Sequence, residues 1–155
     1  MGIESKLIWM NGQLLPYEQA TVHFMSLTLH YGVGAFEGIR CYATPQGPAV
    51  FRLGEHSQRL IDSCKVLGFN QFPYSVEEIN QAVRDVIAAN GYSECYIRPL
   101  VYVNAPTLGL SLDGAQIQLG IAAWEWTNFL GAEARDKGIR ANIASFTRHH
   151  PNVSM

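Results

Sequence analysis

Two helical stretches that follow one another limit, more than any other feature, the folds that this chain can adopt. They occupy residues 56–68 and 76–90, and strand-like segments lie on both sides of the pair. The first stretch ends at Gly68, a typical helix stop, and the second begins with a capping box formed by Ser75 and Glu78. This order predicts a fold of the α/β class (α+β type), in which a mainly antiparallel sheet packs against two or more helices.

The strand-like segments are separated by residues that favour tight turns. Asn11-Gly12 is typical of the type I′ turn of a β-hairpin, and the stretch from Pro45 to Pro48 predicts the turn of a second hairpin. A loop that contains Pro and Gly, residues 104–115, separates the last two strands. The predicted strands are residues 8–10, 14–15, 35–42, 50–51, 95–103 and 117–123.

The character of the sequence changes at Trp124. Residues 124–138 mix aromatic and charged residues without a regular period, which is typical of a connector, and residues 139–146 predict a fresh strand. A lone strand cannot satisfy its own edges. We therefore expect a small domain at 1–123, an interdomain loop at 124–138, and the incomplete beginning of a larger domain at 139–155.

Composition excludes several classes of protein. Hydrophobic residues make up 48% of the chain and charged residues 15%, which indicates a globular protein rather than a disordered one. A net charge of −2 without basic tracts argues against a nucleic-acid partner. The sequence has neither an apolar run of about 18 residues nor a signal pattern, so we expect no membrane partner and a cytoplasmic location.

Neither a disulfide framework nor a metal site is predicted. Cys41, Cys64 and Cys95 are odd in number and lack C-x-x-C spacing. His149 and His150 are adjacent, so they cannot face one ion from a strand, and no third ligand is evident.

The glycine-rich stretch HYGVGAFEGIRCY, residues 30–42, raises the question of a phosphate loop. A P-loop ends in Gly-Lys-Ser/Thr, which is absent here. Gly32, Gly34 and Gly38 are spaced one residue too widely for a dinucleotide loop, and the residues that follow are strand-like. The spacing favours close backbone approach within a sheet over nucleotide binding.

Two predicted strands place an arginine among aromatic or apolar side chains. Strand alternation gives these faces as Phe36, Gly38 and Arg40 on the first strand, and Tyr96, Arg98, Leu100 and Tyr102 on the second. A snorkelling or ion-paired arginine at a sheet edge explains one such face. Two of them indicate a pocket for an anionic, partly apolar molecule, because the planar guanidinium suits a carboxylate or phosphate.

Four stretches, in this order, resemble the branched-chain amino acid aminotransferases of the fold type IV pyridoxal-phosphate enzymes: HYGVGAFEGIRCY, FRLGEHSQRLIDSCK, YIRPLVYV and AAWEWTNFLGAEA. The resemblance covers essentially the whole chain. It implies a small N-terminal domain and the start of a pyridoxal 5′-phosphate domain, in a homo-oligomer that is a dimer or a dimer-based hexamer. The implied reaction is transamination between Leu, Ile or Val and 2-oxoglutarate.

The resemblance also implies roles for single residues. Arg59 matches the arginine that holds the cofactor phosphate, and Arg98 matches the arginine associated with the side-chain carboxylate of glutamate. Arg40 is expected to have a lesser, positioning role. The other matching positions line the substrate pocket. Those of the same subunit are Phe36, Gly38, Tyr96, Trp126 and Phe129. Tyr31 and Leu110 reach the pocket of the neighbouring subunit. Phe129 departs from the tyrosine common in the bacterial enzymes, so any hydroxyl contact made at this position is lost.

The Schiff-base lysine of the family is expected beyond Met155. Lys6, Lys65 and Lys137 do not match its position, so the 155 residues alone are expected to be inactive. Two alternatives stay open. One is another fold type IV enzyme, namely a D-amino-acid or amine transaminase or an aminodeoxychorismate lyase. The other is a non-catalytic domain that binds a carboxylate or only dimerises.

Overall fold

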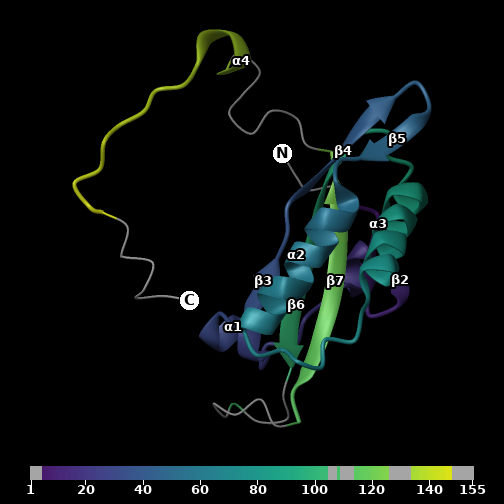
Figure 1. Cartoon of the computed structure of the whole chain (residues 1–155), viewed down its shortest axis with the longest axis vertical. Helices are drawn as coiled ribbons and strands as arrows, with labels where there is room; N and C mark the ends of the chain where they lie inside the picture. The colour runs from purple at the N-terminus through teal and green to yellow at the C-terminus, as the bar shows by residue number, and fades with distance from the viewer. Residues whose placement is uncertain (1–4, 105–107, 109–113, 126–133, 148–155) are drawn as a thin grey trace.

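The computed structural model of the chain describes residues 5–104, 108, 114–125 and 134–147 (Figure 1). Within them, seven strands form one sheet in the spatial order β2-β1-β7-β6-β4-β5, and β3 also pairs with β6. All the pairs are antiparallel, which confirms the predicted fold class. The strands are β1 (Leu7–Met10), β2 (Gln13–Pro16), β3 (Gly34–Phe36), β4 (Ile39–Thr44), β5 (Gly47–Val50), β6 (Cys95–Asn104) and β7 (Gln116–Trp124).

Helices α2 (Leu53–Val66) and α3 (Val76–Asn90) lie side by side against one face of the sheet (Figure 1). The core fills the space between these helices and the sheet, and each Leu- or Ile-sized side chain removed from water there contributes about 1.5–3 kcal/mol. Its fully buried members include Leu60, Phe69, Ile79, Val83, Val86, Ile97, Val101, Leu119 and Ile121. The shorter helical segments are η1 (Tyr17–Gln19), α1 (Leu27–Tyr31) and α4 (Ala134–Lys137).

The ends of α2 and α3 follow from local sequence signals. The Glu78 amide donates to Ser75 Oγ at 3.3 Å, and Glu78 Oε2 accepts from the Ser75 amide at 2.8 Å, which confirms the capping box. Gly68 follows α2 in the left-handed region, with φ 77°. Helix α2 begins at Leu53, before the predicted start, and its cap Arg52 makes no side-chain capping bond. The sequence therefore contains no side-chain capping signal for the N-terminus of α2.

Both predicted hairpins are present. Asn11 and Gly12 join β1 to β2 with φ angles of 50° and 94°, as the two positive values of a type I′ turn require. Pro45 and Gln46 join β4 to β5, and Gly47 takes a φ of 110° as β5 begins.

The strand predicted at 35–42 is divided into β3 and β4 at Glu37 and Gly38 because a proline lies opposite. The Glu37 amide donates to the Pro99 carbonyl at 3.0 Å. Pro99 has no N–H and cannot return the second bond of this antiparallel pair. The register nevertheless continues across the break, with Phe36 opposite Leu100 and Ile39 opposite Ile97. Strand alternation therefore holds through the interruption.

The strand predicted at 139–146 is wrong. Residues 134–147 contain the short helix α4 and no strand. The side chains of Ile143 and Phe146 are almost entirely exposed. An extended segment becomes a strand only by hydrogen bonding to a neighbouring strand, and none pairs with this segment in the described part of the chain. The predicted division at 123/124 and 138/139 stays a prediction.

The three cysteines, Cys41, Cys64 and Cys95, are buried free thiols. Burial raises the pKa of the Cys64 thiol to about 11 and that of Cys95 to about 12. Among the described residues, no group of His, Cys, Asp and Glu is arranged to hold a metal ion. None of the helices in these ranges is long and apolar enough to cross a bilayer.

Candidate cofactor and substrate site

The structure gathers five of the predicted site residues on the sheet face that α2 and α3 leave uncovered. Along β3 and β4, Ala35 and Ile39 are buried in the core, whereas Phe36 is 60% exposed. The register of β4 and β6 places Arg40 directly opposite Tyr96. The residues brought together on this face are Phe36, Gly38, Arg40, Tyr96 and Arg98.

Arg98 is held by aromatic groups rather than by a carboxylate. Its guanidinium carbon lies 4.6 Å from the centroid of the Phe36 ring and 5.4 Å from that of Tyr96. Its Nη2 donates to the Tyr96 hydroxyl at 2.9 Å. Among the described residues, its buried Nε has no hydrogen-bond partner. A cation with an unsatisfied buried donor favours binding of an anionic group.

Gly38 is required by the position of the Tyr96 side chain. A Cβ at Gly38 would collide with the Tyr96 hydroxyl oxygen, so only a residue without a side chain lets the phenol lie here. The Tyr96 ring also packs against Trp124, with centroids 5.0 Å apart. The glycine thus fixes the hydroxyl that accepts from Arg98.

Arg40, on the same face, also has a buried Nε without a hydrogen-bond partner among the described residues, but unlike Arg98 it is paired with a carboxylate. Its Nη2 donates to Glu94 Oε1 at 3.1 Å, and its guanidinium carbon lies 5.5 Å from the Tyr42 ring centroid. This ion pair is partly exposed and agrees with the ion-paired arginine that the sequence also allowed, although β4 lies between β5 and β6 and is not an edge strand. A positioning role for Arg40 stays a prediction.

Of the remaining predicted pocket residues, the structure describes Tyr31 alone. Tyr31 ends α1, its side chain is half exposed, and its hydroxyl donates to the Leu108 carbonyl at 3.0 Å. The predicted site residues that lie outside the described ranges are Leu110, Trp126 and Phe129.

Arg59 belongs to a second cluster, on the helix side of the sheet. His56 and Arg59 are three residues apart on α2, so both reach the same strand, where Glu37 is only 4% exposed. Arg59 Nε and Nη2 donate to Glu37 Oε1 at 2.6 Å and Oε2 at 2.7 Å. His56 Nδ1 donates to Glu37 Oε2 at 2.8 Å, because an ionised carboxylate only accepts. Arg59, the residue predicted to bind the phosphate, is thus already paired with Glu37 through its Nε–Nη2 edge.

The Glu37 carboxyl stays ionised despite its burial. Burial acts to raise its pKa, but the hydrogen bonds and charges of Arg59 and His56 outweigh it and hold the pKa below its ordinary value. The same hydrogen bond raises the pKa of the Arg59 guanidinium.

Glu37 and His56 are the members of the Arg59 cluster that sequence reasoning missed. The signal for Glu37 was present, because alternation with Phe36 and Gly38 puts an acid on the core face, where it needs a cation. The partner itself comes from α2, and its position depends on packing.

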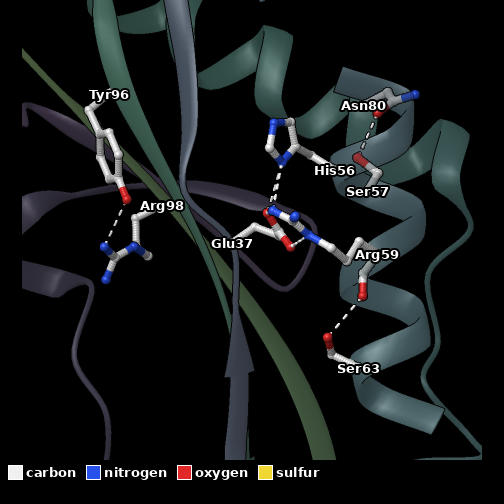
Figure 2. Close-up of polar contacts among 8 residues, drawn as sticks. All are labelled: Glu37, His56, Ser57, Arg59, Ser63, Asn80, Tyr96 and Arg98. Atoms are coloured by element: carbon white, nitrogen blue, oxygen red, sulfur yellow. Dashed lines mark hydrogen bonds and ion pairs between the residues drawn. The ribbon is translucent and has the colours of Figure 1, made fainter. Parts of the chain in front are cut away.

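Two adjacent residues connect the clusters, since Glu37 faces the helices and Gly38 contacts Tyr96. Figure 2 shows Tyr96 and Arg98 on one side of the strand, and Glu37, His56 and Arg59 on the other. Arg59 fits a phosphate ligand chemically, because its side chain is 65% exposed and its Nη1 forms no hydrogen bond to the described residues.

A model of the amino-transferase class IV family matches residues 34–155. The chain belongs to the class IV aminotransferase family. A branched-chain-amino-acid aminotransferase of Pseudomonas aeruginosa is 46% identical to this chain over 149 residues, which cover 96% of this chain and 48% of that protein. The chain therefore spans about half the length of the curated relatives it matches.

Solved structures agree with this membership. A branched-chain amino acid aminotransferase of Escherichia coli superposes with a TM-score of 0.90 at 44% identity, covering 96% of this class IV chain and 49% of that chain. A T.th. branched-chain amino acid aminotransferase, complexed with N-(5′-phosphopyridoxyl)-L-glutamate, superposes with a TM-score of 0.77 at 46% identity, covering 81% of this chain and 42% of that chain. These comparisons confirm the resemblance; fold type IV aminotransferases are pyridoxal-phosphate enzymes.

Proposed function

We propose that this class IV aminotransferase transfers amino groups between branched-chain L-amino acids (Leu, Ile and Val) and 2-oxoglutarate, with pyridoxal 5′-phosphate as cofactor. The observation that carries the proposal is the environment of Arg98. This arginine lies on an otherwise largely aromatic face with a buried Nε that has no partner among the described residues. One side of such a site suits an aliphatic chain, and the other suits a carboxylate.

The two substrates of this reaction differ only in the side chain that the site must accept. A leucine-sized chain gains about 1.5–3 kcal/mol from burial against Phe36 and Tyr96. The side-chain carboxylate of glutamate, in contrast, needs a charged donor, and a hydrogen bond to a charged group contributes about 1.5–3 kcal/mol. Arg98 supplies that donor without a competing carboxylate of its own in the described structure.

Arg59 is the residue of this chain that would hold the cofactor phosphate. Its Nε–Nη2 edge is bound to Glu37, and the Nη1 end is directed away from that contact and is open to an anion. When bound, pyridoxal 5′-phosphate supplies the electron sink for moving the amino group. The complex of the T.th. relative with a phosphopyridoxyl-glutamate adduct supports both the cofactor and the glutamate arm.

A homo-oligomer, a dimer or dimer-based hexamer, belongs to the same proposal, as does a cytoplasmic location. Exposed apolar side chains around α1 support a subunit contact, since Phe24 is 75%, Leu29 60% and Tyr31 48% exposed. Tyr31, which ends α1, would reach the neighbouring pocket from this region, and the resemblance implies the same role for Leu110. Light scattering on the full-length gene product measures the oligomeric state, and a monomer would contradict this part of the proposal.

A substrate panel tests the reaction itself. The full-length gene product, loaded with pyridoxal 5′-phosphate, is expected to form glutamate from 2-oxoglutarate with L-Leu, L-Ile and L-Val. Turnover confined to D-amino acids or to amines would support another fold type IV enzyme. Absence of turnover with every donor, despite bound cofactor, would support a non-catalytic protein.

The three lysines of these 155 residues are not expected to serve as the Schiff-base lysine. Lys65, for example, is paired with Asp62 on α2 at 2.9 Å. The 155-residue polypeptide alone, incubated with pyridoxal 5′-phosphate and reduced with borohydride, is expected to show no single stoichiometrically labelled lysine. Specific labelling of Lys6, Lys65 or Lys137, together with leucine-dependent glutamate formation, would overturn this expectation.

A further inference from the structure

Glu37 is the single charged residue among the buried residues of the described structure. An apolar residue of similar size at this position would avoid the desolvation of a carboxylate, so an ion pair placed here is weak support for stability alone. The effect of the Glu37 carboxylate on Arg59 and His56 therefore explains its presence better than stability does. It contacts Arg59 through both oxygens and His56 through one.

The bidentate contact determines which part of the Arg59 guanidinium is available. A long, mostly exposed arginine side chain samples many rotamers when it is unpaired. Here, Nε and Nη2 are both bound by a carboxylate that is itself buried in the sheet. The plane of the guanidinium and the direction of its Nη1 end are then fixed relative to the sheet.

His56 holds the carboxylate from a second direction. Its Nδ1 lies 2.8 Å from Glu37 Oε2, and its side chain is 20% exposed. The Glu37 backbone is held as well, because its amide donates to the Pro99 carbonyl. The carboxylate therefore forms a fixed support behind the exposed arginine.

We propose that Glu37 is a positioning residue for cofactor binding, which orients Arg59 so that its Nη1 end meets the phosphate of pyridoxal 5′-phosphate. This inference rests on the proposed function, in which Arg59 binds that phosphate. A competing role for Glu37 predicts the opposite change in the affinity for pyridoxal 5′-phosphate when Glu37 is replaced. If Glu37 only neutralised Arg59, its negative charge would repel the phosphate dianion, and removing that charge would tighten binding.

The test compares two ligands that differ only in the phosphate, pyridoxal 5′-phosphate and pyridoxal. Both are titrated by absorbance into the apo form of the full-length gene product. Glu37→Gln is expected to weaken binding of pyridoxal 5′-phosphate by about tenfold or more, as is typical when a residue that orients a ligand-binding side chain is lost. Binding of pyridoxal should change little, because Arg59 has no phosphate to meet.

A double-mutant cycle with Arg59→Ala shows whether Glu37 acts through Arg59. The effect of Glu37→Gln on phosphate-dependent affinity should disappear in the Arg59→Ala background. Asp62→Asn is the matched control, because it removes a carboxylate from an ion pair on α2 that does not involve Arg59. If Glu37→Gln fails to fold, Glu37→Asp, which keeps the charge but withdraws the carboxylate, should show a smaller loss of the same phosphate-dependent kind.

The outcomes separate this inference from the proposed function. Unchanged or tighter binding of pyridoxal 5′-phosphate by Glu37→Gln, with a clear loss in Arg59→Ala, overturns the positioning role and leaves the phosphate role of Arg59 intact. Unchanged binding in Arg59→Ala overturns both. Equal losses for the two ligands in Glu37→Gln would show a general structural role and also overturn the inference.

Discussion

Arg59 and Arg98 lie on opposite sides of the same strand segment, and the fold treats their charges in opposite ways. Arg59 is largely exposed and is bound through two nitrogens by a buried carboxylate. Arg98 is held between the Phe36 ring and the Tyr96 hydroxyl, and its buried Nε has no partner in the described residues. Within the described part of the chain, the fold therefore supplies a counter-charge for Arg59 and none for Arg98.

This difference separates two uses of an arginine in a binding site. An arginine that is already paired is oriented before a ligand arrives, and offers only its remaining donors. An arginine that lacks a carboxylate keeps its full charge for the ligand but depends on neighbouring aromatic groups for its position. In the proposed enzyme, the first arrangement serves the permanent cofactor phosphate, and the second serves a side chain that is charged in only one substrate.

The largest effect is expected for Arg98→Ala on the charged substrate. Losing a hydrogen bond to a charged group should raise the transition-state free energy for glutamate by about 1.5–3 kcal/mol and lower kcat/KM accordingly. The change for leucine should be much smaller. Steady-state kinetics of the full-length gene product with both substrates measures the difference. Equal losses would mean that Arg98 only supports the structure, and Arg84→Ala, at an exposed arginine of α3 that is bonded to Gln81, serves as control.

Gly38→Ala should disturb the Arg98 side selectively. The new Cβ collides with the Tyr96 hydroxyl, so Tyr96 must move and release Arg98, at an overpacking cost of about 1–2 kcal/mol. We expect lower kcat/KM for glutamate and unchanged affinity for pyridoxal 5′-phosphate. Gly54→Ala on α2, where a Cβ meets no atom within 4 Å, is the matched control. A Gly38→Ala enzyme with wild-type glutamate kinetics would contradict the contact.

Stability should respond to Glu37 more than to Arg98. Glu37→Leu removes three charge-assisted hydrogen bonds, but the freed Arg59 is mostly exposed and returns to water, so we expect a loss of about 1 kcal/mol in the free energy of unfolding. Arg98→Leu removes a buried donor that has no partner among the described residues, and should change stability less. Urea unfolding of the full-length gene product compares the two variants. A larger loss for Arg98→Leu would reverse the contrast between the clusters.

The smallest effect is a pH dependence that, of the two arginine clusters, only the one containing Glu37 should show. The pKa of Glu37 is held below its ordinary value of 4.5 by Arg59 and His56 against the opposing effect of burial, so its ionised form stabilises the folded state above pH 4.5. That stabilisation is lost as the pH falls through the lowered pKa. The gap in melting temperature between wild type and Glu37→Gln should therefore narrow as the pH is lowered below 4.5. A gap that stays constant over this range would contradict the ionised pair.

Features encoded by neighbouring residues were predictable. The capping box of Ser75 and Glu78, the helix stop at Gly68 and the Asn11-Gly12 turn each depend on a few consecutive residues, and each is present. The strand predicted at 139–146 failed because β-structure needs a partner strand, which a local apolar pattern does not provide. The break at Glu37 was equally unpredictable, since its cause is Pro99 on another strand.

Alternation along two strands determined from sequence alone that Phe36, Gly38 and Arg40 share a face, and that Tyr96 and Arg98 share another. The four family stretches determined the family. Only the tertiary structure joined the two faces through the β4–β6 register and put α2 against Glu37. The physical reason is that side-chain direction is a property of one strand, whereas the pairing of a charge depends on elements distant in sequence that pack against it. Which arginine is paired with a carboxylate, and which has none among the described residues, was decided there.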